Sequence, residues 1–378
     1  MKVFENFFEK IYDKDIALIG MTEELFAVYV NKLFDNKKNI LIVTSNLVES
    51  NSLYRSISNY VDNVYLFPMD DFLTSEAMAI SPDLMVTRLE TLKEVSSNKP
   101  SIVITNLMGY LRYLPLKKEY LKSVLSLKVN DEISPKELVE KLTNIGYERT
   151  TLVTKTGEIG VRGFVIDIFP LGESNPIRLE FFGDTIDSIR YFDGKSQKSL
   201  SEINSVDIYP YTEIFSNDTF IDKEKRSTKY LSEYGDVTNI GGYLDNRITI
   251  YKDKSSMLIN YKQICTDMLE YREEKDIDFK GSYMFDFDDI YENNALHYLT
   301  VDNLDKSLKV INFNSKELPL FNDDIEGITK YIREKLYANY TVIVCLKDYQ
   351  LHSFRSKISL PIMDTTMDEI YPNKLNLV

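Results

Sequence analysis

The sequence predicts an α/β protein: a doubly wound parallel sheet domain, an α+β domain with an antiparallel sheet inserted into it, and a small C-terminal α/β domain. Short, continuous apolar runs recur in the first hundred-odd residues, as in strands that are buried on both faces. Helix-like segments lie between these runs, and strands that alternate with helices form parallel sheets. From Thr150 to about Tyr209, a period of two replaces this pattern, which indicates an antiparallel sheet.

Composition limits the class of protein and the kind of partner. The 378 residues suggest two to four domains, and 43% of them are hydrophobic, which is enough to fill several cores. The net charge of −14 disfavours nucleic-acid binding, because phosphates attract cationic surfaces and no basic cluster stands out in this sequence. The chain has neither a signal peptide nor an apolar run of the roughly 20 residues that a membrane span needs. We therefore expect a cytoplasmic chain with protein partners and no membrane association.

The elements of the first domain can be assigned in chain order. The predicted strands are Ile16–Ile19, Ile40–Thr44, Val64–Phe67 and Ile102–Thr105. The clearest helix between them starts after Ser81 as N-cap, because Pro82 suits the first helical position and Leu89 and Leu92 share one face.

The later elements are predicted in the same way. A short helix opens with Ser134 and Pro135 and ends at Gly146. Further strands are expected at Ile248–Tyr251 and Met257–Ile259, followed by a helix at Lys262–Glu273. After Asn314 the α/β pattern resumes, with helices at Ile325–Tyr337 and Tyr349–Ile358 and strands at Val342–Leu346 and Lys374–Val378.

The turn after the first predicted strand is where a phosphate-binding loop would lie. Such a loop needs glycines, a Lys that reaches the terminal phosphates, and a hydroxyl that binds Mg²⁺. Only Gly20 and Thr22 fit, since Phe26 stands at the Lys position and Ala27 at the hydroxyl position. Thr22 instead suits the N-cap of a helix whose Phe26 faces a core. We therefore predict a degenerate nucleotide site that does not function.

The most specific run is Arg162–Asp193, RGFVIDIFPLGESNPIRLEFFGDTIDSIRYFD. Its alternation predicts a hairpin with one apolar face, and Gly183-Asp184 suits a type II′ turn into a third strand, Thr185–Phe192. The residues expected on the apolar face are Phe164, Ile166, Ile168, Ile177, Leu179 and Phe181.

Phe182 breaks the pattern of this hairpin. Alternation places it on the polar face with Arg178, and a large aromatic beside an arginine on a polar face is typical of an interface anchor. The alternative is that a neighbouring helix covers this face, so that Phe182 belongs to the core and Arg178 is solvated. The direction of Arg162, next to Gly163 at the strand entry, stays open.

The run resembles the second domain of the UvrB-like region that opens bacterial transcription-repair coupling factors (the Mfd family). There RG-x₃-D-x-FP, a basic residue and FF-x-D-x-IDS-x-R-x-FD recur. The resemblance extends to FPMDD at Phe67–Asp71, SPDLMVTRLETL at Ser81–Leu92 and VDIYP at Val206–Pro210. Beyond Asn314 it is positional only.

The resemblance implies a domain plan. Residues 1–113 and 212–313 are expected to form a degenerate P-loop-like domain of the UvrB domain 1 type, and residues 114–211 the inserted α+β domain of the UvrB domain 2 type. Residues 314–378 are expected to form a small variable α/β domain, truncated before the polymerase-binding and motor domains.

UvrB itself is the nearest rival. A working UvrB needs the P-loop Lys and a tyrosine-rich hairpin between the strand at Phe67 and the helix at Ser81, where this chain has only the short connection MDDFLTSEAMAI. UvrB also carries a pair of acids after an apolar strand. The best match here is Asn260-Tyr261 after Met257–Ile259, and neither side chain binds Mg²⁺ as a carboxylate does.

The family's function implies a recruitment role for this chain in nucleotide excision repair. In that family the second domain binds UvrA, and the contact residues fall on Arg162, Arg178 and Phe182. This surface is masked by a C-terminal domain in the full-length family members, and the module restrains their motor. ATP, Mg²⁺, RNA polymerase and DNA are expected to bind only the absent domains.

Three classes of function stay open. They are the non-catalytic recruitment module, a nucleotide-dependent UvrB-like helicase or damage-verification subunit, and a purely autoinhibitory scaffold. No catalytic or metal-binding residues are predicted: Cys265 and Cys345 read as buried thiols, and two histidines supply no ligand cluster.

Overall fold

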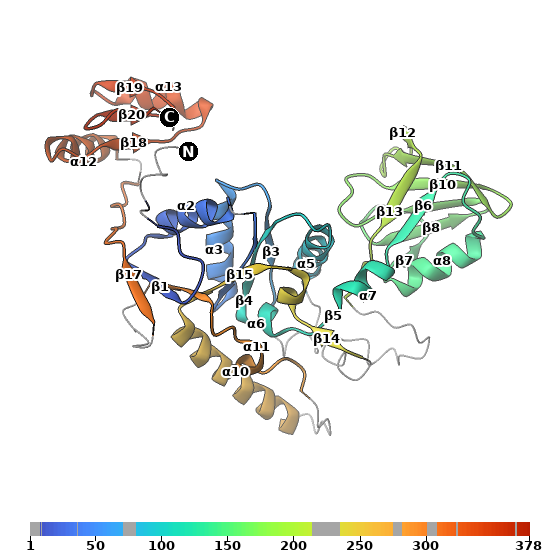
Figure 1. Ribbon diagram of the computed structural model, residues 1–378. Coiled ribbons are helices and arrows are strands. Elements are labelled where there is room, and N and C mark those ends of the chain that lie inside the picture. The colour runs from blue at the N-terminus through green and yellow to red at the C-terminus, as the bar shows by residue number, and fades with distance from the viewer. Residues whose placement is uncertain are drawn as a thin grey trace.

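The computed structural model describes residues 8, 10–35, 37–70, 81–213, 235–274, 282–300, 308–322, 324–366 and 369–378. A sheet flanked by helices lies at the centre, a second sheet lies to one side of it, and a small α/β unit lies at the other end (Figure 1). The predicted α/β class, with one parallel and one antiparallel sheet, is confirmed. The domain boundaries stay predictions.

The central sheet has seven strands in the order β17-β1-β16-β15-β2-β4-β3, and every pairing in it is parallel. Its strands are β1 (Ile16–Ile19), β2 (Asn39–Thr44), β3 (Val64–Phe67), β4 (Ile102–Asn106), β15 (Arg247–Lys252), β16 (Leu296–Leu299) and β17 (Lys309–Asn312). The four strands predicted in the first domain are all present, and their continuous apolar runs reflect burial on both faces.

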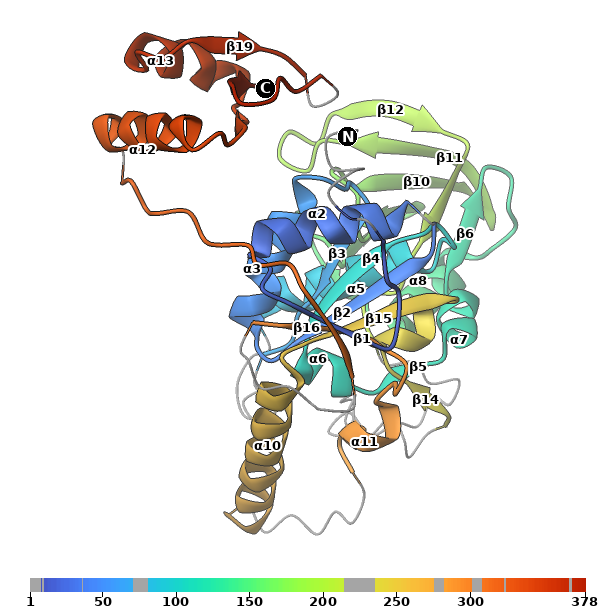
Figure 2. The same cartoon turned by 60° about the vertical axis from the view of Figure 1, so that its left-hand side comes forward.

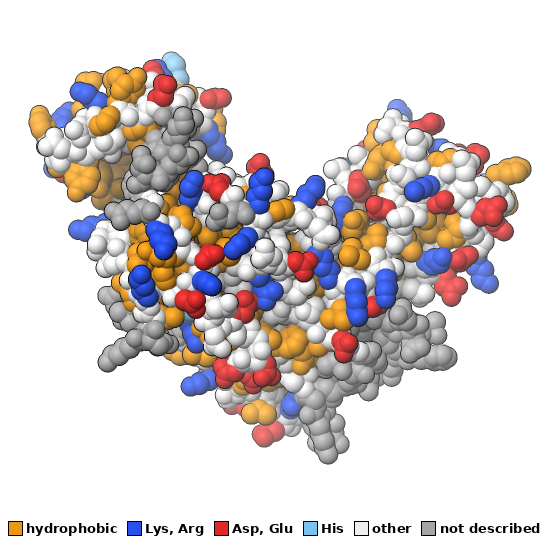
Figure 3. Space-filling model, viewed as in Figure 1, with side chains coloured by type: hydrophobic (Ala, Val, Ile, Leu, Met, Phe, Trp, Pro, Cys, Tyr) orange, Lys and Arg blue, Asp and Glu red, His pale blue; other side chains and the backbone are white. Residues whose placement is uncertain are grey.

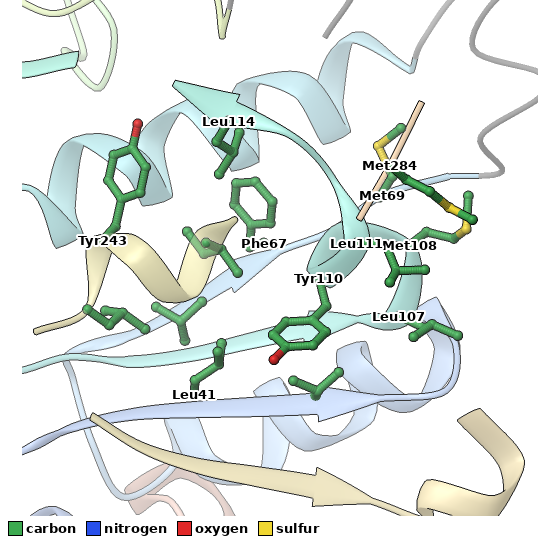
Figure 4. Close-up of a cluster of buried hydrophobic side chains, with 14 of the residues drawn as sticks. Leu41, Phe67, Met69, Leu107, Met108, Tyr110, Leu111, Leu114, Tyr243 and Met284 are labelled. Carbon is green, nitrogen blue, oxygen red and sulfur yellow. The ribbon is translucent and has the colours of Figure 1, made fainter. Parts of the chain in front are cut away.

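Helices cover both faces of this sheet, as a doubly wound fold requires. The helices are α2 (Glu23–Phe34), α3 (Leu47–Ser58), α5 (Pro82–Val95), α6 (Leu107–Leu111), α10 (Lys254–Glu274) and α11 (Phe287–Ile290), with the 3₁₀ helix η3 (Ile240–Tyr243). Ile40 and Ile42 of β2 pack with α2 and α3, whereas Leu41 and Val43 pack with α5, α6 and α10. Figure 4 shows part of the core on the side of Leu41 and Val43, where Phe67 and Leu41 lie near Tyr110.

One predicted strand is wrong. Met257–Ile259 lies inside α10, which begins at Lys254 rather than Lys262. Met257 and Met268 are buried, whereas Ile259 is exposed, so the helix packs along one face. The spacing of the two methionines is close to three helical turns. A run of three apolar residues fits a short strand and a helix equally well, which explains the error.

The second sheet has six strands in the order β12-β11-β10-β9-β8-β7, antiparallel except for the pair β7 and β8. The strands are β7 (Glu148–Thr150), β8 (Glu158–Arg162), β9 (Val165–Ile168), β10 (Ile177–Phe182), β11 (Thr185–Phe192) and β12 (Ser199–Ile203). Helix α8 (Pro135–Asn144) packs on one face, and the Ser134 side chain caps it by accepting the Glu137 N–H. The third strand, β11, has the predicted bounds.

Short elements connect the two sheets. They are β5 (Leu114–Pro115), paired with β14 (Val237–Thr238), the helix α7 (Lys117–Lys122), and β6 (Leu125–Lys128), paired with β13 (Ser205–Ile208). The chain passes toward the six-stranded sheet after Arg112 and returns from it before Glu213.

A buried ion cluster joins these two crossings. Glu213 accepts hydrogen bonds from Arg88 Nε at 2.8 Å and from Arg112 Nη2 at 2.6 Å. All three side chains are at most 5% exposed. Burial raises the pKa of the Glu213 carboxyl, but Arg112 and Arg88 outweigh it and lower that pKa to about 2. The cluster therefore ties α5, the exit from the first domain and the return from the second at one point.

The last unit has a three-stranded parallel sheet in the order β18-β20-β19. Its elements are α12 (Ile325–Tyr337), β18 (Val342–Val344), α13 (Asp348–Lys357), β19 (Ile362–Asp364) and β20 (Leu375–Leu377). An extended segment joins it to β17 (Figure 2). The two predicted helices and two predicted strands are present, and β19 was not predicted. Cys345, expected to be buried, is exposed because it follows β18 at the end of the strand, and Cys265 is only partly buried.

Candidate partner-binding site

Two tight turns lie side by side at one end of the six-stranded sheet. Gly163 and Phe164 connect β8 to β9, and Gly183 and Asp184 connect β10 to β11. Strands β9 and β10 are paired, and the Phe181 N–H donates to the Phe164 carbonyl at 2.9 Å. Both turns therefore belong to the same edge of the molecule. We call this edge, formed by residues 162–165 and 181–185, the open end of the sheet.

Glycine is required at the start of each turn. Gly163 has a φ of +62° and Gly183 a φ of +64°, in the left-handed region. Asp184 does not have positive φ, which agrees with the predicted type II′ turn. No described atom outside the turn would lie within 4 Å of a Cβ added at either glycine, so the backbone of both turns is uncrowded.

Phe182 is 83% exposed and is not part of a core. The alternative in which a helix covers this residue therefore does not hold. Phe164, expected on the apolar face, is 65% exposed. The reason is that Phe164 lies in the turn before β9 instead of in the strand. Its strand neighbours Ile166 and Ile168 are fully buried, as predicted.

Arg178 is engaged within its own sheet. Its Nε and Nη2 donate to the two oxygens of Asp167 at 2.6 and 2.8 Å, and Nη2 also donates to Gln197 at 3.0 Å. The guanidinium lies 4.4 Å from the centre of the Phe192 ring. These hydrogen bonds to the Asp167 carboxylate raise the pKa of Arg178. Arg178 is therefore not simply solvated, and its main role in this structure is to neutralise the buried Asp167.

A second ion pair lies on the same face. Arg190 of β11 donates to Glu180 of β10, and this hydrogen bond lowers the pKa of the Glu180 carboxyl. The Arg190 Nε finds no partner among the described residues. The sequence analysis missed Asp167 and Arg190 as partners: Asp167 faces Arg178 across β9 and β10, whereas Arg190 lies diagonal to Glu180, so both pairings depend on the strand register. Each of these two arginines therefore has a carboxylate partner on this face.

Arg162 lies at the end of β8 and is exposed. Its Nη2 donates to the Thr151 carbonyl at 2.9 Å, which holds the side chain against the segment that follows β7. Arg162 and Phe182 thus both belong to the open end, whereas Arg178 lies further inside the sheet. The space-filling view shows this domain as a separate lobe with acidic, basic and hydrophobic side chains interspersed (Figure 3).

The turn after β1 is filled by the chain itself. Gly20 has a φ of +64°, and its carbonyl accepts from the Ser315 N–H and Oγ at 2.7 and 2.9 Å. The Thr22 N–H donates to Ser315 Oγ at 2.8 Å, and a Cβ at Gly20 would lie 2.3 Å from Asn312 Oδ1. Residues 312–315 therefore occupy the turn where a phosphate would lie, and the Thr22 N–H, a possible phosphate donor, is already bonded to Ser315.

The helix after this turn is built as predicted. Thr22 caps α2 by accepting the Leu25 N–H, and Phe26 and Ala27 are fully buried. The Phe26 ring stacks on Tyr298 of β16 with the centroids 3.9 Å apart and the planes at 7°. The position of the P-loop Lys is thus part of the core.

The predicted counterpart of the metal-binding acids is wrong. Asn260 and Tyr261 lie within α10, where Asn260 donates to the Ser45 carbonyl at 3.4 Å and Tyr261 packs near Phe287. They do not follow a strand, because Met257–Ile259 is helical.

Asp253 is the acid that follows a central parallel strand. It comes directly after β15, at the carboxyl edge where open α/β sheets bind ligands. Its two oxygens accept from the Thr300 N–H at 2.7 Å and Thr300 Oγ1 at 2.6 Å. Lys252 pairs with Glu49 next to it. The apolar run RITIYK followed by an acid could have indicated it. No group of three or more potential metal ligands occurs in the part of the chain that the structure describes.

A cavity of ≈ 570 Å³ lies between α3, β3, α5 and the loop at Gly172. Charged side chains of α5 line it, and one of them, Lys93, donates to the Leu171 carbonyl at 3.1 Å. It brings together none of the predicted site residues. No described helix is long and apolar enough to cross a membrane.

Comparison with known proteins points to the six-stranded sheet. The family model described as "UvrB interaction domain" matches residues 125–214, which include β8 to β11 and the whole open end. Transcription-repair-coupling factors match a longer part of the chain than this family model does. The protein from Bacillus subtilis is 30% identical over 204 residues, which are 53% of this chain and 17% of the relative.

The chain is similar to transcription-repair-coupling factors. Those of Staphylococcus epidermidis and Staphylococcus aureus are 32% and 34% identical over 234 and 204 residues, or 61% and 53% of this chain. The predicted resemblance to this family is therefore confirmed. The chain spans about a fifth of the length of the coupling factors it matches, since the matched parts are 17 to 20% of them.

Proposed function

We propose that this chain recruits UvrA to a stalled RNA polymerase, as the non-catalytic module of a transcription-repair coupling factor in nucleotide excision repair. The observation that carries the proposal is Phe182, 83% exposed at the open end of a sheet that matches a UvrB interaction domain. Single exposed hydrophobic residues are common, but an exposed aromatic at the end of a sheet, beside a polar face, has the features of an interface anchor.

The three predicted contact residues take different roles in this proposal. Phe182 enters an apolar pocket of UvrA, and Arg162 pairs with an acidic group at the edge of the contact. Arg178 positions β10 through Asp167 and contributes to binding chiefly through the shape of the sheet. The parallel sheet and the six-stranded sheet correspond in this proposal to the first and second domains of UvrB.

A calorimetric titration with purified UvrA tests this role. We expect saturable binding, and we expect Phe182→Ala to weaken it by about thirtyfold or more, the scale of an interface hot spot. Leu200→Ala is the matched control, because Leu200 is 55% exposed on β12 of the same sheet, away from the open end. Equal affinity of the Phe182→Ala variant and the wild-type chain would remove the site assignment.

We also propose that this chain does not bind or hydrolyse ATP. The support is the turn after β1, which Asn312 and Ser315 fill, and the stacked Phe26 at the position of the Lys. A titration with Mg²⁺ and ATP should give no measurable heat. An ATPase activity that co-purifies with the chain through every purification step would instead favour the helicase alternative.

The resemblance further suggests that another domain of a full-length coupling factor covers the open end and that the module restrains the motor. If so, full-length protein binds UvrA more weakly than this chain does. Equal affinities would contradict the masking. If the chain fails to bind UvrA, the remaining function is that of a purely autoinhibitory scaffold.

A further inference from the structure

This inference rests on the proposed function and concerns the chemistry of the contact. We propose that Phe164 is a second apolar anchor for UvrA beside Phe182. The sequence analysis assigned Phe164 to the core, and nothing in the resemblance assigns it a role.

Two phenylalanines stand apart from all others that the structure describes. Phe164 and Phe182 are the described phenylalanines whose side chains are exposed, at 65% and 83%. The remaining described ones are buried or partly buried. Exposed phenylalanine adds nothing to the stability of a fold, because its apolar surface stays in water. Finding both at one end of one sheet therefore needs a reason other than folding.

The backbone holds the two residues next to each other. The hydrogen bond from the Phe181 N–H to the Phe164 carbonyl places Phe164 beside Phe181 across β9 and β10, and Phe182 is the next residue. Residues that face each other in an antiparallel pair share a face, and successive residues alternate. Phe182, the last residue of β10, therefore lies toward the side of the ion pairs, whereas Phe164 lies in the turn at the end of the sheet. A partner that contacts both rings has to cap the end of the sheet.

Nothing in the described chain blocks such a cap. Gly163 and Gly183, which precede Phe164 and follow Phe182, have open space where a Cβ would be. Both turns are two-residue connections, the shortest in common use, so the backbone of the anchors is held firmly.

The charged groups of the sheet near the open end are mostly paired with one another. The guanidinium of Arg178 is occupied by Asp167 and Gln197, and Arg190 is paired with Glu180. These ion pairs neutralise one another inside the sheet, so they offer little net charge to a partner. Arg162 is the exposed cation at this end, and its Nη2 already donates to the Thr151 carbonyl. The exposed side chains at the open end are therefore Arg162, Asp184 and the two rings, and the rings predict apolar groups on UvrA.

Calorimetric titration of UvrA with Phe164→Ala, Phe182→Ala and the double variant tests the inference. We expect Phe164→Ala to weaken binding at least about tenfold and the double variant to bind more weakly than either single one. Leu200→Ala should bind as wild type does. Because Phe164 is exposed, its variant should melt at the wild-type temperature, and this measurement separates lost contact from lost fold.

A second readout is the dependence on salt. The ratio of the affinities of the wild-type chain and Phe164→Ala should change less than about twofold when the salt is raised from about 0.05 to 0.5 M, since salt screens only charges. A ratio that falls to about one at high salt would overturn the inference. So would a Phe164→Ala variant that binds within about twofold of wild type while Phe182→Ala is impaired. If the wild-type chain does not bind UvrA at all, the proposed function fails, and this inference fails with it.

Discussion

At the scale of single residues, Arg178 and Phe182 show how one strand combines a structural and a binding role. Both were predicted to touch a partner, yet Arg178 is 17% exposed and bonded to Asp167, whereas Phe182 projects from the sheet. Sequence alternation gives the face of a residue but not the neighbours on the adjacent strand. The partner of Arg178 depends on the register of β9 and β10, which the sequence alone did not fix.

This pairing leads to a prediction about stability. Arg178→Ala removes the cation that compensates a carboxylate with only 6% exposure, so we expect it to destabilise the chain by about 2 to 3 kcal/mol. Urea unfolding measures the change, and the exposed Arg162→Ala is the control, expected within about 0.5 kcal/mol of wild type. Equal stability of the two variants would show that the ion pair contributes nothing to the fold.

At the scale of elements, the turn after β1 depends on a glycine for two separate reasons. Gly20 and Gly183 have the same φ of +64°, but a Cβ at Gly20 would meet Asn312 at 2.3 Å, whereas one at Gly183 meets nothing within 4 Å. Alanine substitutions at Gly20 and Gly183 therefore distinguish the cost of backbone strain, which both share, from the cost of a steric clash, which only Gly20 has.

We expect Gly183→Ala to cost about 1 kcal/mol in unfolding free energy from the left-handed conformation alone. Gly20→Ala should cost at least about 1 kcal/mol more, because residues 312–315 must move out of the turn. Denaturant unfolding of both variants measures this difference. Equal costs would mean that Asn312 and Ser315 do not fill the turn as described.

The helix α2 gives a related prediction. Phe26→Lys restores the residue type that a phosphate loop needs, but it buries an amine against Tyr298 and leaves Ser315 in place. We expect a loss of about 3 kcal/mol in stability and no gain in nucleotide affinity. Thermal melting with and without Mg²⁺ and ATP is the measurement. A stabilisation by nucleotide that appears only in this variant would contradict the filled turn.

The elements that could be predicted are those with a strong local signal. β1, β2, β3 and β11 follow from apolar runs or alternation, and the start of α5 follows from Ser81 and Pro82. The start of α10 was misassigned because the short apolar run Met257–Ile259 fits a strand as well as a helix. Phe164 was misassigned because alternation was extended one residue beyond the strand, into the turn.

At the scale of the whole molecule, the sequence predicts the succession of parts but not their contacts. The order β17-β1-β16-β15-β2-β4-β3 brings β15 and β16 between β1 and β2, although more than 200 residues separate Thr44 from Arg247. Such pairings decide where Asp253 and Ser315 lie, which explains why the filled turn and the acid after β15 were not foreseen. The cluster of Arg88, Arg112 and Glu213 likewise joins residues from three distant segments.

This cluster predicts the behaviour of the chain in acid. The pKa of Glu213 is lowered from 4.5 to about 2 in the folded state, so its contribution is fully present above about pH 4.5 and is lost as the pH falls toward 2. By linkage, the contribution is about 3 kcal/mol at neutral pH.

The matched variant is Glu213→Gln, which keeps the shape of the side chain but cannot ionise. We expect it to be about 3 kcal/mol less stable than wild type at pH 7 and to differ by less than half of that near pH 3. Urea unfolding at both pH values measures the two differences. A difference that does not change with pH would show that the charge of Glu213 does not stabilise the junction of the two sheets.

The central claim is that a nucleotide-binding type of scaffold presents UvrA with the open end of its second sheet. Hydrogen–deuterium exchange of the chain with and without UvrA tests it most directly, because it reports every segment at once. The account predicts slower exchange at residues 160–166 and 178–186 and no change at the turn after β1 or along α2. Protection that leaves both turns of the open end unchanged, and falls on the central sheet or the last α/β unit instead, would contradict it.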